Sequence, residues 1–216
     1  MPKFSCTFTE DIVDPDEVCT AENICADDPR IKDSWIDWDS RNSLHNWYES
    51  LDLKCADSWQ VSGISFANFI GCLITLPWAP KLGDVLGRKK ILTWFNLVQF
   101  LSFTVIMFNK NLWVMTAASG VFGATNSIVA SNGFLYMLEL VPQKSKTRVA
   151  TIFFMLDQTT YLLTTVYFWV ISKHWFWIVF VGYIMQIIGV ILYWFLLESP
   201  AFLLSLNRSD ETMEVF

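Results

Sequence analysis

The sequence predicts an all-α membrane protein in which five transmembrane helices follow a small, disulfide-bearing external domain. Three observations predict this fold class. The chain has 216 residues and is 53% hydrophobic and 16% aromatic, which is too apolar for an ordinary soluble domain. Its apolar residues gather in runs of about 20, the length at which a helix crosses a bilayer. Most of its acidic residues lie instead near the N-terminus, together with four of its five cysteines.

Residues 1–60 are predicted to form the external domain. They carry 14 acidic and 5 basic side chains, a net charge of −9, whereas residues 61–216 carry a net charge of +3. An acidic segment repels phosphate, which argues against nucleic acid as its partner. The first 16 residues are acidic and polar, and they give no sign of a signal peptide or a basic transit segment.

Cysteines in this domain predict two disulfides, with three pairings possible. A zinc site is the alternative, but the domain has no Cys-x-x-Cys pair and its one histidine is His45. Asp33, Asp37 and Asp39 lack the glycine and the bidentate glutamate of a calcium loop, so they indicate a solvated acidic surface. The sequence therefore predicts no metal site and no cofactor. The cysteines are Cys6, Cys19, Cys25 and Cys55.

Five apolar runs are predicted to span the membrane as helices. Asp157 is the only charged residue within them. The buried helices of a soluble protein are the alternative, but polar faces and loops would interrupt such helices more often. The predicted spans are residues 61–80, 91–108, 112–138, 149–171 and 175–197.

Loop charges predict the orientation of these helices. Residues 83–90 and 143–148 carry three basic side chains each, whereas the connections 109–111 and 172–174 carry one lysine each. Basic connections mark the cytoplasmic side, so the external domain and the two other connections lie outside. The tail, residues 199–216, is then cytoplasmic, and its Asn-Arg-Ser sequence at 207–209 is not expected to be glycosylated.

Residues 83–90 also form a motif, Gly-Asp-Val-Leu-Gly-Arg-Lys-Lys. It resembles the loop between the second and third helices of major facilitator superfamily transporters. The matching residues are Asp84, Gly87, Arg88, Lys89 and Lys90, while Val85 stands where the family has an arginine.

Three further segments resemble family motifs in the same order. Residues 53–59, Leu-Lys-Cys-Ala-Asp-Ser-Trp, are similar to the end of the external loop in organic cation and carnitine transporters. Glu-Leu-Val-Pro at 139–142, followed by Arg148, resembles the motif after the fourth helix, and residues 198–204 resemble the end of the sixth. The resemblance implies part of an N-terminal half, comprising the external loop and helices two to six. Helix one and the second half would then be missing.

In this family, charged groups at the cytoplasmic helix ends form ion pairs that latch one conformation of the transporter. The resemblance therefore implies a transport latch in this chain, made of Asp84, Gly87, Arg88, Lys89, Lys90, Glu139, Arg148 and Glu198.

Polar residues inside the predicted spans are the other candidates for a site. Asp157 either binds a cationic substrate or a proton, or it pairs with Gln158 or a neighbouring helix. Asn126 and Asn132 are predicted to join helices by hydrogen bonds.

The sequence argues against an enzyme. It has no glycine-rich phosphate loop and no nucleophile beside a base, and both histidines lie outside the spans. Two functions remain. One is a truncated, transporter-derived protein that serves as a structural or accessory subunit of a larger membrane assembly. The other is a transporter of small organic ions that acts with a missing second half. The first is favoured because the site of such a transporter lies between two halves.

The predicted partners are the lipid bilayer and other membrane protein subunits, with a small organic ion if the chain transports. The predicted location is a plasma membrane or an organelle membrane such as the mitochondrial inner membrane, because the outer side of either tolerates disulfides.

Overall fold

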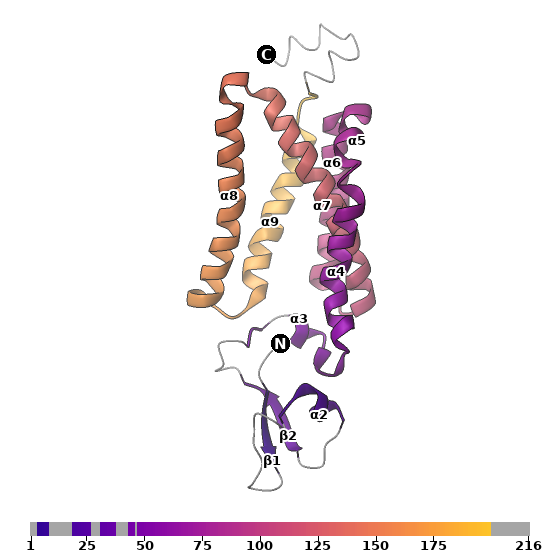
Figure 1. Ribbon diagram of the computed structural model, residues 1–216, viewed down its shortest axis with the longest axis vertical. Coiled ribbons are helices and arrows are strands. Elements are labelled where there is room, and N and C mark those ends of the chain that lie inside the picture. The colour runs from indigo at the N-terminus through magenta and orange to yellow at the C-terminus, as the bar shows by residue number, and fades with distance from the viewer. Residues whose placement is uncertain (1–3, 9–18, 27–30, 38–42, 46, 200–216) are drawn as a thin grey trace. The chain divides into compact units, whose positions relative to one another are not determined.

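The computed structural model describes residues 4–8, 19–26, 31–37, 43–45 and 47–199 (Figure 1). It is mainly helical, which confirms the predicted fold class. Its contacts divide the chain into two compact units, Met1–Val61 with Thr164–Val179 and Ser62–Leu163 with Phe180–Phe216. Asp39, the sequence at 207–209 and the tail beyond Ser199 lie outside the described residues.

The first unit contains a two-stranded antiparallel sheet, which the sequence prediction did not include. Strand β1 (Phe4–Phe8) pairs with β2 (Ile31–Ile36). Phe4 lies opposite Ile36, and both side chains are buried. Phe4, Cys6 and Phe8 alternate with the hydroxyl residues Ser5 and Thr7 along β1, which suits a strand with one buried face. The short helix α2 (Ala21–Cys25) lies between the two strands in the chain, and α3 (Trp47–Ser50) and the 3-10 turn Leu53–Cys55 follow β2.

Disulfides and backbone pairing hold this unit together. Cys6 is bonded to Cys19 and Cys25 to Cys55, which confirms two disulfides and selects one of the three pairings. Because these four sulfurs are bonded to one another, the zinc alternative is left without cysteine ligands. His45 also joins the 164–179 segment, since its backbone N–H donates to Lys173 O at 3.0 Å and its carbonyl accepts from the Trp175 N–H at 3.1 Å.

Six longer helices make up most of the remaining described residues. Four helical segments of the described chain are long and apolar enough to cross a membrane. The pair α4 and α5, which is bent by 52°, adds a fifth if it forms one span. The helices are α4 (Ser58–Thr75), α5 (Ala79–Leu86), α6 (Arg88–Phe108), α7 (Leu112–Leu140), α8 (Lys146–Val166), which continues as the π-helical turn Tyr167–Ile171, and α9 (Trp175–Trp194).

The first predicted span, residues 61–80, is not one straight helix. It breaks between α4 and α5, next to two prolines. Pro77 has no N–H to donate and disfavours helical backbone at the residue before it. Pro80 lies in the first turn of α5, where a missing N–H has no cost. The expectation that residues 83–90 form a loop is also wrong, because α5 runs to Leu86 and α6 begins at Arg88.

Small residues let α4 approach α7 closely. A Cβ added at Gly71 would lie 2.1 Å from Gly120 O, and one at Gly123 would lie 2.0 Å from Asn68 O. Only glycine fits such contacts between helix backbones. Ser119 then donates its hydroxyl to a backbone carbonyl of α4 at 2.8 Å.

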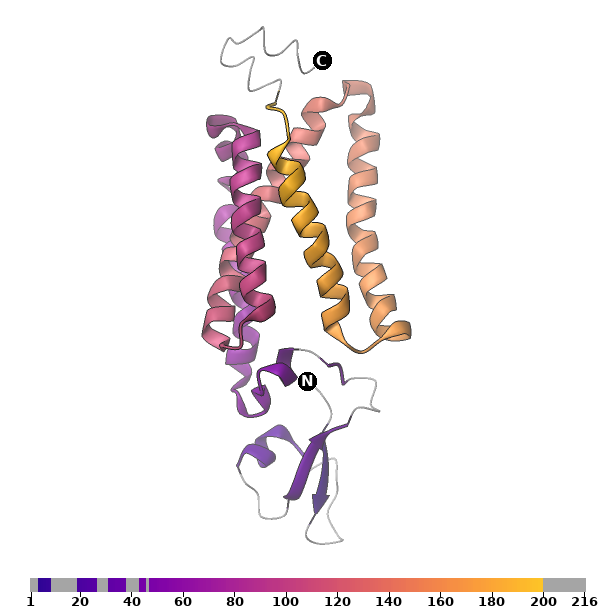
Figure 2. The ribbon, with the colours of Figure 1, turned by 180° about the vertical axis from the view of Figure 1, so that it is seen from behind.

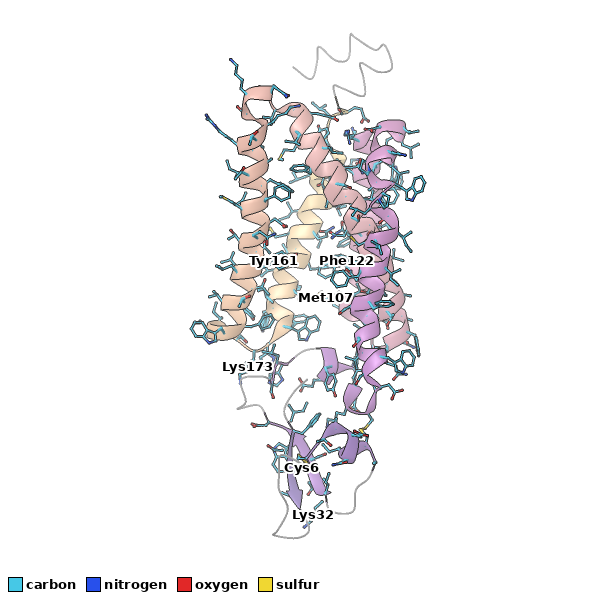
Figure 3. The ribbon with its side chains drawn as sticks, viewed as in Figure 1. Cys6, Lys32, Met107, Phe122, Tyr161 and Lys173 are labelled. Carbon is cyan, nitrogen blue, oxygen red and sulfur yellow. A yellow bond between two sulfur atoms is a disulfide. The ribbon has the colours of Figure 1, made fainter. Side chains whose placement is uncertain are left out.

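Helix α9 touches α6 through tyrosines, and α8 makes few contacts. The Tyr183 hydroxyl lies 3.2 Å from Thr104 Oγ1, and Thr93 Oγ1 donates to Tyr193 O at 3.1 Å, so α9 lies beside α6 from Tyr183 to its C-terminal end (Figure 2). Within the described chain, α8 and α9 contain no buried residue. Tyr161, labelled in Figure 3, is an example on α8 and is 67% exposed. Both helices therefore present apolar faces that the second unit leaves uncovered.

Candidate functional site

The α5–α6 junction is built around a single non-helical residue. Gly87 adopts φ 92°, a conformation that side-chain-bearing residues rarely take, and it separates α5 from α6. Arg88 is therefore the first residue of α6, and its side chain is only 8% exposed. A cation is disfavoured at a helix N-terminus, where the peptide dipoles leave partial positive charge. Arg88 thus needs carboxylates close by.

Two carboxylates supply that compensation. Arg88 Nη2 lies 2.8 Å from Asp84 Oδ1, across the Gly87 break. Its Nε and Nη2 both reach Glu139 Oε1, at 2.8 Å and 2.7 Å. The Asp84 side chain is 62% exposed, whereas that of Glu139 is 21% exposed. The Arg88–Glu139 pair is therefore the buried part of this cluster, and it joins α6 to α7.

Asn132 holds the cluster in place from α7. It is fully buried, and it donates to Ala79 O at 2.7 Å and to Ile128 O at 2.9 Å. Its Oδ1 accepts from Arg88 Nη1 at 3.4 Å. These bonds confirm that Asn132 joins helices, while Asn126 accepts from Gln99 at 3.0 Å.

The contact between Asn132 and Arg88 was not predicted from the sequence. The sequence feature that could have indicated this contact is the spacing of seven residues between Asn132 and Glu139. Seven residues make about two helical turns, so both side chains lie on one face of α7. Gly83 belongs to the same contact, because a Cβ there would lie 1.9 Å from Asn132 Oδ1.

Residues that follow α9 complete the cluster. The Ser199 hydroxyl donates to Glu139 Oε2. Glu198 Oε1 accepts the backbone N–H of Lys89 at 3.0 Å, and Tyr136 donates its hydroxyl to Leu197 O at 3.0 Å. Arg88 thus connects α5, α6 and α7, and Glu139, Tyr136 and the Lys89 N–H connect them to the chain after α9. We call Asp84, Arg88, Asn132, Glu139, Glu198 and Ser199 the junction cluster.

Three basic residues of the implied latch lie outside these bonds. Within the described parts of the chain, the side chains of Lys89, Lys90 and Arg148 make no hydrogen bond or ion pair. Arg148 is exposed on the first turn of α8. The structure therefore brings together the acidic residues of the implied latch and one of its cations.

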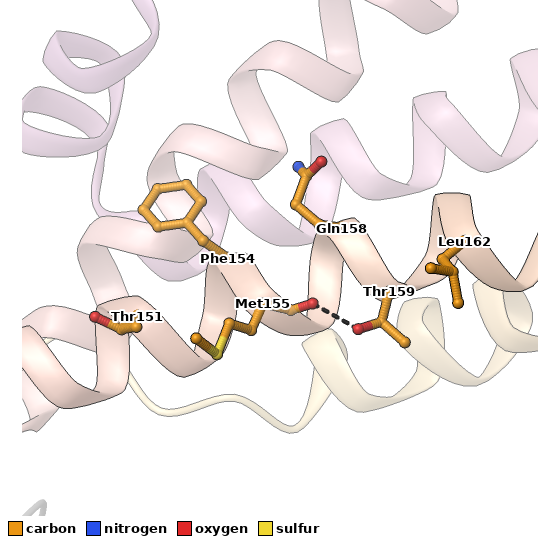
Figure 4. A pocket seen from close by; sticks show the side chains of 6 residues that line it. All are labelled: Thr151, Phe154, Met155, Gln158, Thr159 and Leu162. Carbon is orange, nitrogen blue, oxygen red and sulfur yellow. Dashed lines mark hydrogen bonds between the residues drawn. The ribbon is translucent and has the colours of Figure 1, made fainter.

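Asp157 lies on α8 and is exposed. Its Oδ2 accepts from Gln158 Nε2 at 3.2 Å, which is the pairing named as the alternative to a substrate role. A hollow of about 640 Å³ runs beside it along the same helix, and Asp157 is not among its lining residues (Figure 4). Those residues are Thr151, Phe154, Met155, Gln158, Thr159 and Leu162.

Known proteins share this sequence pattern. The chain is 24% identical to organic cation/carnitine transporter 6 of Arabidopsis thaliana, over 99% of this chain and 40% of the relative. It is 25% identical to solute carrier family 22 member 2 of Homo sapiens, over 85% of this chain and 32% of the relative. The chain thus spans about a third to two fifths of the length of these curated relatives. Residues 49–211 match the Major Facilitator Superfamily, and the chain therefore belongs to this superfamily of multi-pass membrane proteins.

Proposed function

We propose that this helix bundle takes part in moving a small organic ion across a membrane, together with further helices of the transporter fold. The junction cluster is the observation that carries the proposal. Ion pairs that form in one arrangement of helices and break in another set the balance between two conformations. Arg88 is suited to this task because its two carboxylates come from different helices and one of the pairs is largely dehydrated.

Two further observations support an organic ion as the substrate. Relatives over most of the chain bear the names of organic cation and carnitine transporters. Asp157 offers the one charged side chain of α8 beyond Arg148, in an apolar stretch where a carboxylate is costly unless it serves a cation, a proton or a partner helix. In this proposal Asp157 is the group that attracts the cation.

Uptake of a radiolabelled quaternary ammonium ion, by cells that produce the chain together with the second half of an organic cation transporter, tests the proposal. We expect uptake above that of cells without the chain, and at least a tenfold loss with Asp157→Asn. Asp57→Asn is the matched control, because it removes a carboxylate outside the candidate spans. Unchanged uptake with Asp157→Asn would remove the substrate role of Asp157, and absence of uptake would overturn the proposal.

A second candidate is a structural or accessory subunit of a larger membrane assembly. The uncovered faces of α8 and α9 favour it, because other membrane helices could pack on them. Native gel electrophoresis of the detergent-extracted protein separates the candidates. A lone species of 25.0 kDa would contradict the subunit role. Migration with a second transporter half would support transport, and migration with unrelated membrane proteins would support the subunit.

A further inference from the structure

We propose that a pocket between α6 and α9 binds the phosphate of an anionic phospholipid. The pocket has a volume of about 270 Å³. Its walls come from the first two turns of α6 and the last turn of α9, and they consist of Lys89, Lys90, Thr93, Trp94 and Trp194. The proposal needs only that the chain lies in a membrane, and it is independent of transport.

Hydrogen bonds fix the walls of this pocket. Thr93 Oγ1 donates to Lys89 O at 2.9 Å and to Tyr193 O at 3.1 Å, so one side chain holds α6 against the end of α9. The Lys89 backbone N–H donates to Glu198 Oε1 at 3.0 Å, which secures the same end of α6 to the chain that leaves α9. The two lysines and the two tryptophans therefore lie on helix ends that hydrogen bonds hold together.

The charges of the pocket suit a phosphate. Arg88 pairs with Asp84 and Glu139, while the ammonium groups of Lys89 and Lys90 have no anionic partner in the described chain. The carboxylate that bonds to this part of α6 is that of Glu198, and its Oε1 accepts the backbone N–H groups of Lys89 and Ser199. The pocket lining thus carries two positive charges and no negative one. Basic pockets between membrane helices at a bilayer surface bind anionic headgroups.

The tryptophans identify a lipid, rather than free phosphate, as the source of that phosphate. Trp94 and Trp194 are each 59% exposed, at the ends of two helices that can cross a membrane. Indole rings favour the headgroup level of a bilayer, where one edge meets hydrocarbon and the N–H meets water. Glycerol and the first acyl carbons of a phospholipid would cover these rings, whereas inorganic phosphate has nothing apolar to place there.

Native mass spectrometry of the purified chain in mixed micelles tests this proposal. The probes are phosphatidylglycerol, phosphatidylcholine and inorganic phosphate. We expect phosphatidylglycerol to bind most tightly, with an apparent Kd that rises roughly 30-fold in Lys89→Gln/Lys90→Gln, because a lysine near an anionic surface changes affinity roughly fivefold. Trp94→Leu should weaken phosphatidylglycerol binding while leaving any phosphate binding unchanged.

Lys144→Gln/Lys146→Gln is the matched control, because it removes two charges at the α7–α8 connection, on the same end of the helices as the pocket (Figures 1 and 2). Equal losses in both double variants would overturn the pocket in favour of general surface attraction. Inorganic phosphate that binds as tightly as phosphatidylglycerol would overturn the lipid. If the Lys89→Gln/Lys90→Gln variant does not fold, Lys90→Gln decides, since Lys90 is exposed and its roughly fivefold effect is measurable. An unchanged Kd in that variant would refute the proposal.

Discussion

Replacement of Arg88 by methionine tests whether the junction cluster holds the helices together. The change keeps an unbranched side chain of similar length and removes the charge. It leaves Glu139, which is 21% exposed, as a carboxylate without its cation, and it removes the donor to buried Asn132. Asp84, in contrast, is 62% exposed and can be solvated where it stands.

The expected magnitudes follow from these exposures. Removing one partner of a buried ion pair costs about 3 to 5 kcal/mol, whereas an exposed pair contributes about 0 to 1 kcal/mol. Glu139 is not fully buried, so we expect Arg88→Met to lower the free energy of unfolding by about 3 kcal/mol. Asp84→Asn should lower it by less than about 1 kcal/mol. Arg88→Met/Glu139→Gln should cost less than Arg88→Met, because no unpaired charge then remains in the interior.

The measurement is unfolding of the purified protein by sodium dodecyl sulfate in mixed micelles, followed by tryptophan fluorescence. The chain has 11 tryptophans, so the signal is large, and none is replaced in these variants. Equal losses in the free energy of unfolding for Arg88→Met and Asp84→Asn would show that the buried Arg88–Glu139 pair stabilises the protein no more than the exposed pair does. A double variant less stable than Arg88→Met would refute the argument from an unpaired charge.

Three further predictions concern packing, pH and the disulfides. Gly71→Ala should destabilise the protein by about 1 to 3 kcal/mol through overpacking. Gly63→Ala should not, because no atom lies within 4 Å of its added Cβ. Thermal unfolding of the two variants measures the difference. Burial, and secondly the Asp52 carboxylate, raise the pKa of Tyr48 in the folded protein. The contribution of Tyr48 to stability is therefore complete below about pH 10, and it is lost as the pH rises through the raised pKa. Tyr48→Phe should remove that loss in unfolding curves between pH 8 and 11. Peptide mapping without reduction should recover Cys25 bonded to Cys55, and removal of this disulfide should cost about 4 kcal/mol, against about 3 kcal/mol for the shorter loop.

Long apolar runs made most of the helices predictable from the sequence. The runs at 91–108 and 175–197 correspond to α6 and α9 within a few residues, because membrane-length helices are set by composition more than by specific contacts. The break in the first span was missed although Pro77 and Pro80 signalled it. Two prolines in an apolar run do not prevent its prediction as a span from hydropathy. In the backbone, however, each proline lacks an N–H donor and disfavours helix at the residue before it.

The strand pair and the disulfide pairing depend on contacts between distant residues. β1 and β2 are short, and 22 residues separate them, so no turn signal joins them. Four cysteines allow three pairings, and only the folded chain selects one. Likewise, the motif at 83–90 indicated Arg88 as important, but its partner Asn132 lies in another helix and required the structure.

The arrangement of α5 has a mechanical consequence. Its eight residues form a rod of about 12 Å, joined to α4 at a 52° bend and to α6 by one glycine. Gly87 supplies two soft dihedrals between α5 and α6, so rotation at this residue is enough to change the angle between the two helices. Asp84 and Gly83 travel with the rod. A change in the angle between α4 and α5 would therefore move the Asp84 carboxylate, which pairs with the guanidinium of Arg88.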